Sequence, residues 1–520
     1  MWVPPADPTK LSEHIDFPKV ETRPAVKANG STPVKPTNKK PTIAEKLIEI
    51  GTDERFVELF HTWEGDAFAD VYVDGHRETH PIRSAGYKAW LRREYYLRHK
   101  GSPNAEAMTQ ALEMLSAKAL YDGDVYAVYL RMAHVDGAIY LDLCDKDWRA
   151  VEVTEDGWQV VDEPPVRFIR RKKMLPLPAP EQGGDIPTLG GLCDHLNLDP
   201  NSQEYKLLVG WLLGCLRGKG PFPVLGIGGE QGSAKSDLLY LLKRLVDPTK
   251  GGLRGPPKDD RDLFISALNG YILAFDNFSH ISSDLADSMC RLATGAGFST
   301  RALFTDDEEV VFDGQRPIAI TAITDVATRS DLADRSMLVH LKSIPEDKRK
   351  LQEDVYRAFD KARPTILGAL LNVVAHGLMR YPDVRPNTLP RMADFAKWMI
   401  ACETAMWDAG MFIAAYEVSQ KQASTNVLEA DLVASTLLPW IKRTTPFEGT
   451  ATELLGILEG QIDDQTRRRK DWPKNASALS GKLTRITPPM RKAGVTIDNQ
   501  DRTKKQRKIT ITYQRPADDE

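Results

Sequence analysis

Gly229-Glu230-Gln231-Gly232-Ser233-Ala234-Lys235-Ser236 is the stretch that decides the fold of this 520-residue sequence. The apolar run at 224–227 precedes it and is typical of a fully buried parallel strand. A leucine-rich helix is expected directly after Ser236. A strand, a glycine-rich loop that ends in Lys-Ser, and a helix form the context of a phosphate-binding loop, where backbone N–H groups and a helix N-terminus face the phosphates.

Each part of this loop has an expected role. Gly229 and Gly232 let the backbone approach the phosphates, Lys235 reaches the β- and γ-phosphates, and the Ser236 hydroxyl binds Mg²⁺. The usual pattern has glycine where this chain has Ala234, which is tolerable unless the backbone there needs a positive φ. A chance glycine-rich turn before a helix is disfavoured because all the parts are in register. The predicted cofactors are ATP and Mg²⁺, bound by Gly229, Glu230, Gln231, Gly232, Ser233, Ala234, Lys235 and Ser236.

A second expected strand, at 271–275, ends in Asp276-Asn277. Asp276 is predicted to hold Mg²⁺ together with Ser236. Asn277 stands where nucleotide motors usually carry a second acid, which orients the attacking water. The general base is therefore unassigned, and Glu230 and Asp287 are the alternatives.

From 190 to 341 the sequence resembles superfamily III helicases, an AAA+ branch that includes poxvirus-type primase-helicases and phage replication proteins. A helix at 284–293 is followed by Thr294-Gly295-Ala296-Gly297, by a hairpin-like segment at 299–312 and by a strand that begins near Arg316 and reaches Thr321. The segment 329–335, Arg-Ser-Asp-Leu-Ala-Asp-Arg, completes the match.

The resemblance implies roles for several of these residues. Thr321 corresponds to the polar sensor, and Arg335, or alternatively Arg329, to an arginine finger that acts on a neighbouring subunit. A finger acting in trans implies a ring, by family analogy a hexamer; a surface salt bridge to nearby Asp residues is the plainer reading. The hairpin would project toward DNA, but its tip at 306–309 is acidic, so contact would fall to Arg301 or Arg316 at its base. A purely structural hairpin is the alternative.

The C-terminal segment is basic although the net charge is −4. Between 467 and 515 there are 15 Lys and Arg residues against 3 acidic ones. Helices at 450–458 and 475–486, a short helix after Pro488-Pro489, and strands at 495–497 and 509–512 around a basic turn predict a winged helix. A solvated basic tail is the alternative. The predicted DNA-binding residues are Arg301, Lys482, Arg485, Arg491, Lys504, Lys505 and Arg507.

The expected fold is an α/β P-loop AAA+ core with an N-terminal α+β domain, a helical domain and a C-terminal winged helix. Its divisions are a disordered tail (1–42), an N-terminal α+β accessory domain (43–163), a proline-rich linker (164–187), the ATPase domain (188–345), the helical domain (346–445) and the basic DNA-binding domain (446–515). A hydrophobic content of 42% and five separated cysteines are typical of a cytoplasmic globular protein with reduced thiols. No apolar run is long enough to span a membrane.

Two other clusters in the N-terminal region are weaker candidates for chemistry. His76 and His80 follow a hairpin turn, so they are not expected to share a face as helical zinc ligands do. Asp142 and Asp145 follow an apolar strand but lack further acids at a useful spacing for a two-metal primase site. We interpret the region as an accessory module for DNA or partner docking.

These patterns favour an ATP-dependent helicase or translocase in the DNA replication of a phage or mobile element. The expected partners are single-stranded or forked DNA, further copies of the chain, and a separate primase or polymerase. A switch that binds or loads an origin without travelling is the main alternative, and a nucleotide-gated defence or scaffold ATPase is a second. All three need the same phosphate loop.

Overall fold

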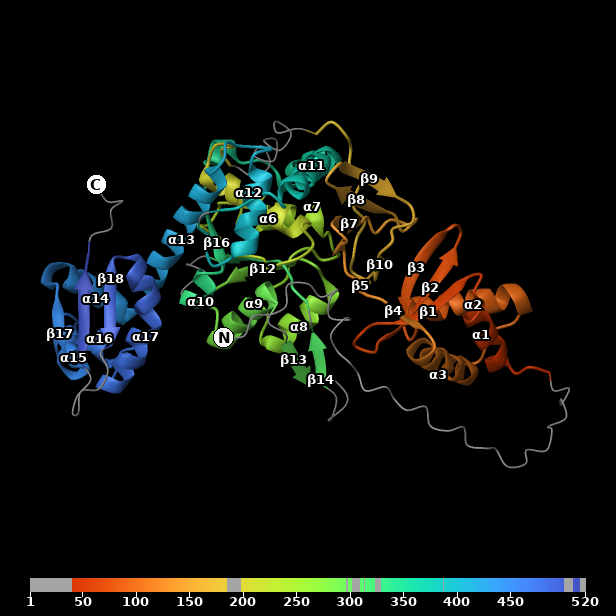
Figure 1. The fold of residues 1–520 in the computed structure, drawn as a ribbon, viewed down its shortest axis with the longest axis horizontal. Helices are drawn as coiled ribbons and strands as arrows, with labels where there is room; N and C mark the ends of the chain where they lie inside the picture. Colours follow the sequence, from red (N-terminus) through yellow and green to blue (C-terminus); the bar gives the residue numbers. More distant parts are fainter. Residues whose placement is uncertain are drawn as a thin grey trace, which may run out of the picture.

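The computed structural model describes residues 40–184, 198–295, 298–301, 309–312, 314–322, 329–386, 388–499 and 508–514. The expected tail at 1–42 lies almost entirely outside them. Three units follow one another along the long axis, with the N-terminal unit at one end and the C-terminal unit at the other (Figure 1).

The central unit is built on four parallel strands in the order β12-β15-β11-β16. Its strands are β11 (Val224–Gly229), β12 (Leu273–Phe278), β15 (Ile318–Ala322) and β16 (Ser336–Leu341), and its helices are α6 (Gln203–Leu216), α7 (Lys235–Val246), α8 (Asp260–Asn269), α9 (Ser283–Thr294) and α10 (Ser330–Ala333). A single parallel bridge from Arg254 to Phe275 extends the sheet beyond β12. The strand, loop and helix predicted around 224–242 are present at these positions.

Both faces of this sheet are buried, which explains its continuous apolar strands. Leu225 and Ile227 of β11 point into a core shared with α6 and α7, whereas Val224 joins a core with α8 and α9. The alternation of side chains along one strand therefore supplies two separate cores.

A helical unit covers one side of the sheet. It consists of α11 (Gln352–Arg380), α12 (Ala393–Glu403) and α13 (Met411–Ala430), in agreement with the helical periodicity of the sequence, whereas the next helix, α14 (Leu432–Thr444), packs in the core of the C-terminal unit. Helix α13 packs along β16 and continues toward the C-terminal unit (Figure 1).

The N-terminal unit has a core of its own. It contains α1 (Ile43–Gly51), β1 (Val57–His61), β2 (Ala67–Val73), β3 (His76–Pro81), α2 (Ala85–His99), α3 (Ala105–Tyr121) and β4 (Asp124–Val125). The expected turn at Asp74-Gly75 joins β2 to β3. The aromatic residues Tyr87, Trp90 and Tyr95 of α2 are buried in this core.

The histidines of β3 do share a face, contrary to the expectation from the sequence. His76 and His80 each place Nε2 within hydrogen-bond distance of one oxygen of Glu78, at 3.1 and 2.8 Å. Side chains two and four residues apart lie on the same face of a strand, a relationship that the comparison with helical spacing overlooked. Among the described residues, no group of three or more acidic, His or Cys side chains is placed to hold a metal ion.

A second antiparallel sheet belongs to the central core and not to the N-terminal one. It comprises β6 (Met132–Val135), β7 (Ala138–Asp142), β8 (Ala150–Thr154) and β9 (Gly157–Val161). Its apolar residues Ile139, Leu141 and Val153 share a core with α6, α7 and α11. The division expected near residue 163 therefore differs from the division of the hydrophobic core, because this sheet packs against helices that come later in the chain, from Gln203 onward.

The proline-rich stretch 164–187, expected to be a linker, is packed over its described part. Its strand β10 (Arg167–Phe168) pairs with β5 (Val128–Tyr129), and Arg167 forms ion pairs with Asp70 and Glu58. Arg170 forms an ion pair with Asp142 at 2.6 Å, while Asp145 pairs with Arg149. Both aspartates that were considered for metal chemistry are thus neutralised by arginines.

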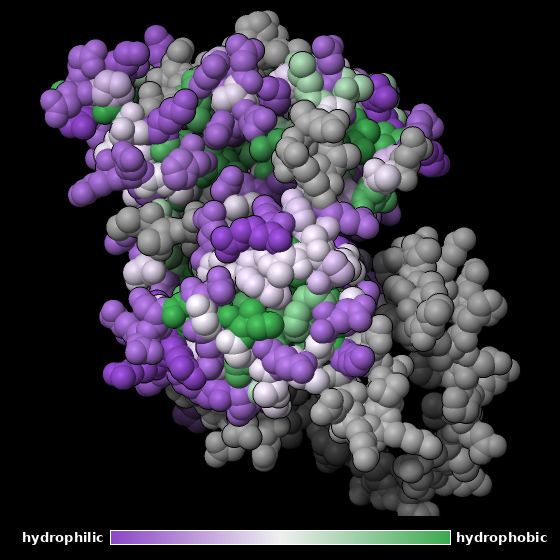
Figure 2. All heavy atoms as spheres, turned by 90° about the vertical axis from the view of Figure 1, so that its left-hand side faces the viewer, coloured by the Kyte–Doolittle hydropathy of each residue, from purple (hydrophilic) through white to green (hydrophobic). Residues whose placement is uncertain are grey.

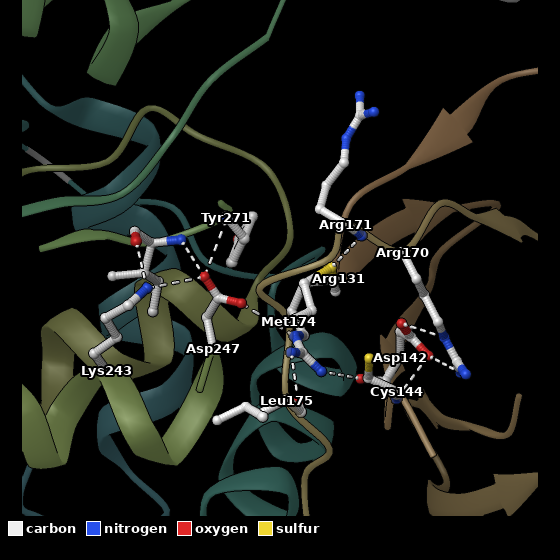
Figure 3. Close-up of polar contacts among 11 residues, drawn as sticks. Arg131, Asp142, Cys144, Arg170, Arg171, Met174, Leu175, Lys243, Asp247 and Tyr271 are labelled. Carbon is white, nitrogen blue, oxygen red and sulfur yellow. Dashed lines mark hydrogen bonds and ion pairs between the residues drawn. The ribbon is translucent and has the colours of Figure 1, made fainter. Parts of the chain in front are cut away.

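A buried charged cluster joins the second sheet to the central unit (Figure 3). Asp247, at the end of α7, is 1% exposed and accepts bonds from Arg131 and Lys243, each at 3.2 Å. It also accepts from the backbone N–H groups of Tyr271 and Ile272, just before β12. Burial by itself would raise the pKa of Asp247, but Lys243 and Arg131 hold that pKa below its usual value.

The C-terminal unit combines helices with a three-stranded sheet in the order β17-β19-β18. Its elements are β17 (Phe447–Gly449), α15 (Ala451–Glu459), α16 (Asp464–Arg468), α17 (Ala476–Lys492), β18 (Val495–Asn499) and β19 (Ile509–Tyr513). Strand β17 was not expected from the sequence. Hydrophilic residues cover much of the coloured surface seen from this end of the molecule (Figure 2).

Helix α17 continues through Pro488 and Pro489, where the sequence predicted a break. The two prolines leave the carbonyls of Thr484 and Arg485 without their helical donors. Both residues are exposed, so water can bind these carbonyls, while Ile486 and Met490 keep the helix attached to the core.

Candidate functional site

The loop 229–236 lies at the carboxyl end of β11, between the neighbouring strands β15 and β16. Gly229 has a φ of 142° and Gly232 a φ of 81°. A Cβ at Gly229 would lie 2.5 Å from the carbonyl oxygen of Leu341, so no larger residue fits there. The two glycines therefore meet a conformational and a steric requirement of the loop.

Ala234 adopts the left-handed conformation, with φ 60° and ψ 31°. The sequence predicted that alanine would be unfavourable at this position if the backbone needed a positive φ, and the backbone does have a positive φ here. An L-residue in this region costs about 1–2 kcal/mol relative to the right-handed conformation. The loop thus keeps the geometry that glycine would give it, with some backbone strain.

Lys235 opens α7 and folds back across the loop. Its Nζ donates to the carbonyl oxygens of Gly229 and Glu230 at 2.6 and 2.7 Å. Partial burial lowers the pKa of this ammonium group, and the nearby Asp276 carboxylate opposes the change. The positive charge therefore lies against the backbone of the loop, which favours the approach of an anion.

Two predicted residues from separate elements, Ser236 and Thr321, meet at Asp276. The Ser236 hydroxyl donates to Oδ1 of Asp276 at 2.8 Å, and the Thr321 hydroxyl donates to the same atom at 2.5 Å. A hydroxyl and a carboxylate at the edge where parallel strands end are oxygen ligands suited to Mg²⁺. The side-chain chemistry and its position therefore fit a magnesium ion next to the phosphate loop.

Asn277 lies in an irregular part of β12, where the register with β15 shifts between Phe275 and Phe278. Its φ is 65°, and its backbone N–H donates to the Thr321 hydroxyl at 2.8 Å. Such irregularities redirect a side chain from the regular pleat. The exposed Asn277 amide is thereby placed beside Asp276 at the end of the strand.

The two alternatives for the general base, Glu230 and Asp287, lie on the loop and on α9. Glu230 is exposed on the loop. Asp287, on α9, forms an ion pair with Arg329 at 3.4 Å.

Arg335 and Arg329 flank the short helix α10. Arg335 is 20% exposed on its side chain, and its Nη1 donates to the carbonyl oxygen of Asp331 at 3.0 Å. Arg329 is 40% exposed. Both precede β16 at its amino end, which is the opposite edge of the sheet from the phosphate loop.

The hairpin expected before the third motif is present as β13 (Phe298–Arg301) and β14 (Glu309–Phe312), which pair in an antiparallel manner. Residues 306–308 of its acidic tip, and the side chains of Arg301 and Glu309, lie outside what the structure describes. Arg316, the other residue expected at the base of the hairpin, is half-buried. Its guanidinium donates to the carbonyl of Ala267 at 3.1 Å, and burial lowers its pKa to about 10.

The predicted DNA-binding residues of the C-terminal unit differ in accessibility. Arg485 and Arg491 are exposed on α17, whereas Lys482 pairs with Asp431 at 3.3 Å. Lys504, Lys505 and Arg507 lie outside the described residues. Lys492, which was not among the predicted residues, pairs with Asp334 of the central unit at 2.7 Å.

Two family models match this chain. Residues 189–424 match the actinomycete integrative conjugative element replication protein, and residues 433–519 match the AICE RepA C-terminal domain. The two matches follow each other along the chain and describe parts of the same replication protein. The chain is a replication protein of a mobile element.

Other comparisons add little to this assignment. No curated protein matches the replication protein. Among solved structures, two apo structures of the NrS-1 C-terminal region align over 91% of this chain and 100% of theirs, with 11% and 12% identity and TM-scores of 0.39 and 0.36. Such TM-scores are too low for an inference about fold or function. Within the described residues, no helix has the length and apolar character needed to cross a bilayer.

Proposed function

We propose that this replication protein is an ATP hydrolase with an AAA+-type P-loop core, and that it works on DNA as a helicase or translocase. The observation that carries the proposal is the convergence of Lys235, Ser236 and Asp276 at the carboxyl end of the parallel sheet. Lys235 would neutralise the β- and γ-phosphates, and Ser236 with Asp276 would hold Mg²⁺. Mg²⁺ would supply charge neutralisation at the phosphates during transfer.

The residues around Asp276 would prepare the attack on the γ-phosphate. Thr321 would fix the Asp276 carboxylate and would sense the nucleotide from the next strand. Asn277 cannot take a proton at neutral pH, but an amide can orient a water molecule. We propose that basal hydrolysis is slow for this reason and that DNA and ring closure make the site competent.

The ATPase proposal is tested first with Lys235→Ala in the full-length protein. We expect loss of ATP turnover with an unchanged unfolding temperature, because the lysine head group contacts loop carbonyls and not the core. Lys361→Ala removes an exposed lysine from α11 and serves as the matched control. Turnover by Lys235→Ala at the wild-type rate would refute the phosphate-loop assignment.

The element order of the C-terminal unit supports a DNA-binding role. Helix α14, strand β17, helices α15 and α17, and the β18–β19 hairpin follow the order of a winged helix. We propose that exposed Arg485 and Arg491 contact phosphates, together with the basic stretch of sequence at 502–508. Replacing both arginines by alanine should weaken duplex binding and reduce its salt dependence, because fewer counterions are released. An unchanged slope of affinity against salt would exclude these two contacts.

Two assays run together distinguish a helicase, which unwinds DNA, from a switch that only binds or loads an origin. ATP turnover is measured without DNA, with single-stranded DNA and with a forked duplex, and strand displacement is followed on the same fork. A helicase should show both DNA-stimulated turnover and displacement. Turnover without displacement would favour the switch, and turnover that ignores DNA would favour the defence or scaffold ATPase.

A further inference from the structure

The segment that follows β16 passes directly beside the phosphate loop. The backbone N–H of Ile344 donates to the carbonyl oxygen of Gly232 at 3.3 Å. A short 3₁₀ helix, Glu346–Lys348, then leads to Arg349. The segment that follows β16 is therefore hydrogen-bonded to the middle of the phosphate loop.

Arg349 brings a guanidinium group close to Gly232 of the loop. Its Nη2 lies 3.7 Å from the position that a Cβ would take at Gly232. The side chain is 55% exposed, and its Nε donates to the carbonyl of Ile344 at 3.3 Å. Its acidic neighbour Glu346 is 91% exposed and 3.9 Å away, a distance and exposure at which an ion pair contributes little.

The other end of the segment is fixed to the helix that leaves the loop. Gln352 and Tyr356, in the first turns of α11, both donate to Oδ1 of Asp237, at 2.5 and 2.7 Å. Asp237 directly follows Ser236. Tyr356 also stacks on Tyr240 of α7, with ring centroids 4.8 Å apart. Arg349 is thus carried on a short segment held at both ends by the phosphate loop and its helix.

We propose that Arg349 is a second cationic ligand for the nucleotide, acting within the same subunit on the α- and β-phosphates. This inference rests on the proposed nucleotide site. The loop amides cradle the α- and β-phosphates, whereas Lys235 reaches the β- and γ-phosphates. A guanidinium can donate two parallel hydrogen bonds to a phosphate, and its weak hydration favours this exchange of water for ligand. Arg349 therefore holds the diphosphate part of ATP and ADP alike.

The test is the affinity of the full-length protein for MgADP and MgATP, measured by calorimetry. Arg349→Ala should weaken both affinities by roughly 10- to 100-fold, the range for a hydrogen bond to a charged group. Arg349→Lys should fall between, since it keeps the charge and loses the paired donors. Arg357→Ala is the matched control, because Arg357 is 68% exposed on α11 and pairs only with Glu353 and Asp354 of that helix among the described residues.

The outcomes separate this inference from the function on which it rests. Wild-type affinity for ADP in Arg349→Ala, beside weakened binding in Lys235→Ala, overturns the role of Arg349 and leaves the nucleotide site in place. If Arg349→Ala loses affinity for MgATP but not for MgADP, the assignment of Arg349 to the α- and β-phosphates is overturned. Wild-type protein that binds neither nucleotide overturns the nucleotide site and the role of Arg349 together. Arg349 is more than half exposed, so an unchanged unfolding temperature is expected for its variants.

Discussion

The Thr321 hydroxyl donates a 2.5 Å hydrogen bond to Oδ1 of Asp276 and accepts one of 2.8 Å from the N–H of Asn277. Thr321 is 2% exposed and lies on β15, the strand beside β12. One side chain therefore fixes both residues at the end of the neighbouring strand.

Thr321→Val should lower ATP turnover by about 10- to 100-fold and leave nucleotide affinity nearly unchanged. Valine keeps the volume but removes both hydrogen bonds, so Asp276 and Asn277 lose their alignment for the transition state while the phosphate loop is intact. Steady-state hydrolysis and ADP binding measure the two effects. Thr321→Ser keeps the hydroxyl and should retain most of the turnover; equal losses in the two variants would contradict this role.

Ala234→Gly should stabilise the central unit by about 0.5–1 kcal/mol. Glycine removes the strain of a positive φ, and the greater freedom of the unfolded chain offsets part of that gain. Ala234→Val should destabilise, since a β-branched residue is still less tolerant of φ 60°. In urea unfolding, the free energy of unfolding should decrease in the order glycine variant, native protein with Ala234, valine variant. A glycine variant less stable than the native protein would contradict the strain at Ala234.

Asp247→Ala should destabilise the protein by about 3–5 kcal/mol. The change leaves Arg131 and Lys243 buried without their anion and removes the acceptor for two backbone N–H groups before β12. Urea unfolding measures the loss. Asp354→Ala breaks an exposed ion pair with Arg357 and should change stability by less than about 0.5 kcal/mol. Similar losses of stability in the two variants would show that the buried cluster contributes no more to stability than an exposed ion pair does.

Acid should destabilise the fold partly through His134. Burial, with Lys219 nearby, lowers the pKa of His134 to about 4, and Nδ1 lies 2.8 Å from the carbonyl oxygen of Arg217. The unfolded chain, with a pKa of about 6.5, binds the proton more readily between these values. The contribution of the neutral imidazole to stability is therefore complete above pH 6.5 and is lost as the pH falls through 4.

His134→Asn tests this pH dependence, since asparagine can keep a donor for Arg217 but does not titrate. Unfolding midpoints at pH 7 and pH 5 should differ less in the variant than in the native protein. The same difference in both proteins would show that His134 does not contribute.

The sequence predicted the parts of the site that lie within one local pattern. The stretch 224–242 was correctly predicted as strand, loop and helix, because its apolar run, its glycine spacing and its helical periodicity all indicate this order of elements. The left-handed φ of Ala234 was named only as a condition, since nothing in the sequence reports that dihedral angle. Arg349 was missed because its place beside Gly232 depends on how β16 and α11 pack, and its own segment has no periodicity.

Long-range contacts also explain the differences in domain division. The sheet β6–β9 has the strands and turns expected of it, but its burial partners are on α6, α7 and α11. Arg131 and Asp247, which join these parts, are 116 residues apart. Alternating hydrophobicity identifies a buried face but does not say which element covers it.

The register between β11 and β16 determines which end of the sheet Arg335 lies at, and so which nucleotide site it can reach. Val224 pairs with Ser336, and Gly229 pairs with Leu341, so Arg335 lies at the amino end of β16 while the phosphate loop lies at the carboxyl end. Five residues of strand separate these ends by roughly 17 Å. That span exceeds the reach of an arginine whose Nη1 is bonded to the carbonyl of Asp331, so a catalytic role for Arg335 requires the site of another subunit.

We therefore expect Arg335→Ala to reduce hydrolysis by at least about 1000-fold, the size of effect typical of an arginine finger, and to keep nucleotide affinity. Mixing it with Lys235→Ala should restore part of the turnover if the chains form a ring, because a mixed ring would contain interfaces where an intact Lys235 site meets an intact Arg335. Arg329→Ala, at the more exposed arginine, is measured in the same way, and restoration with that variant alone would move the finger to Arg329. Failure of both mixtures at every ratio, with mixed rings detected by mass, would contradict a finger acting in trans from this segment.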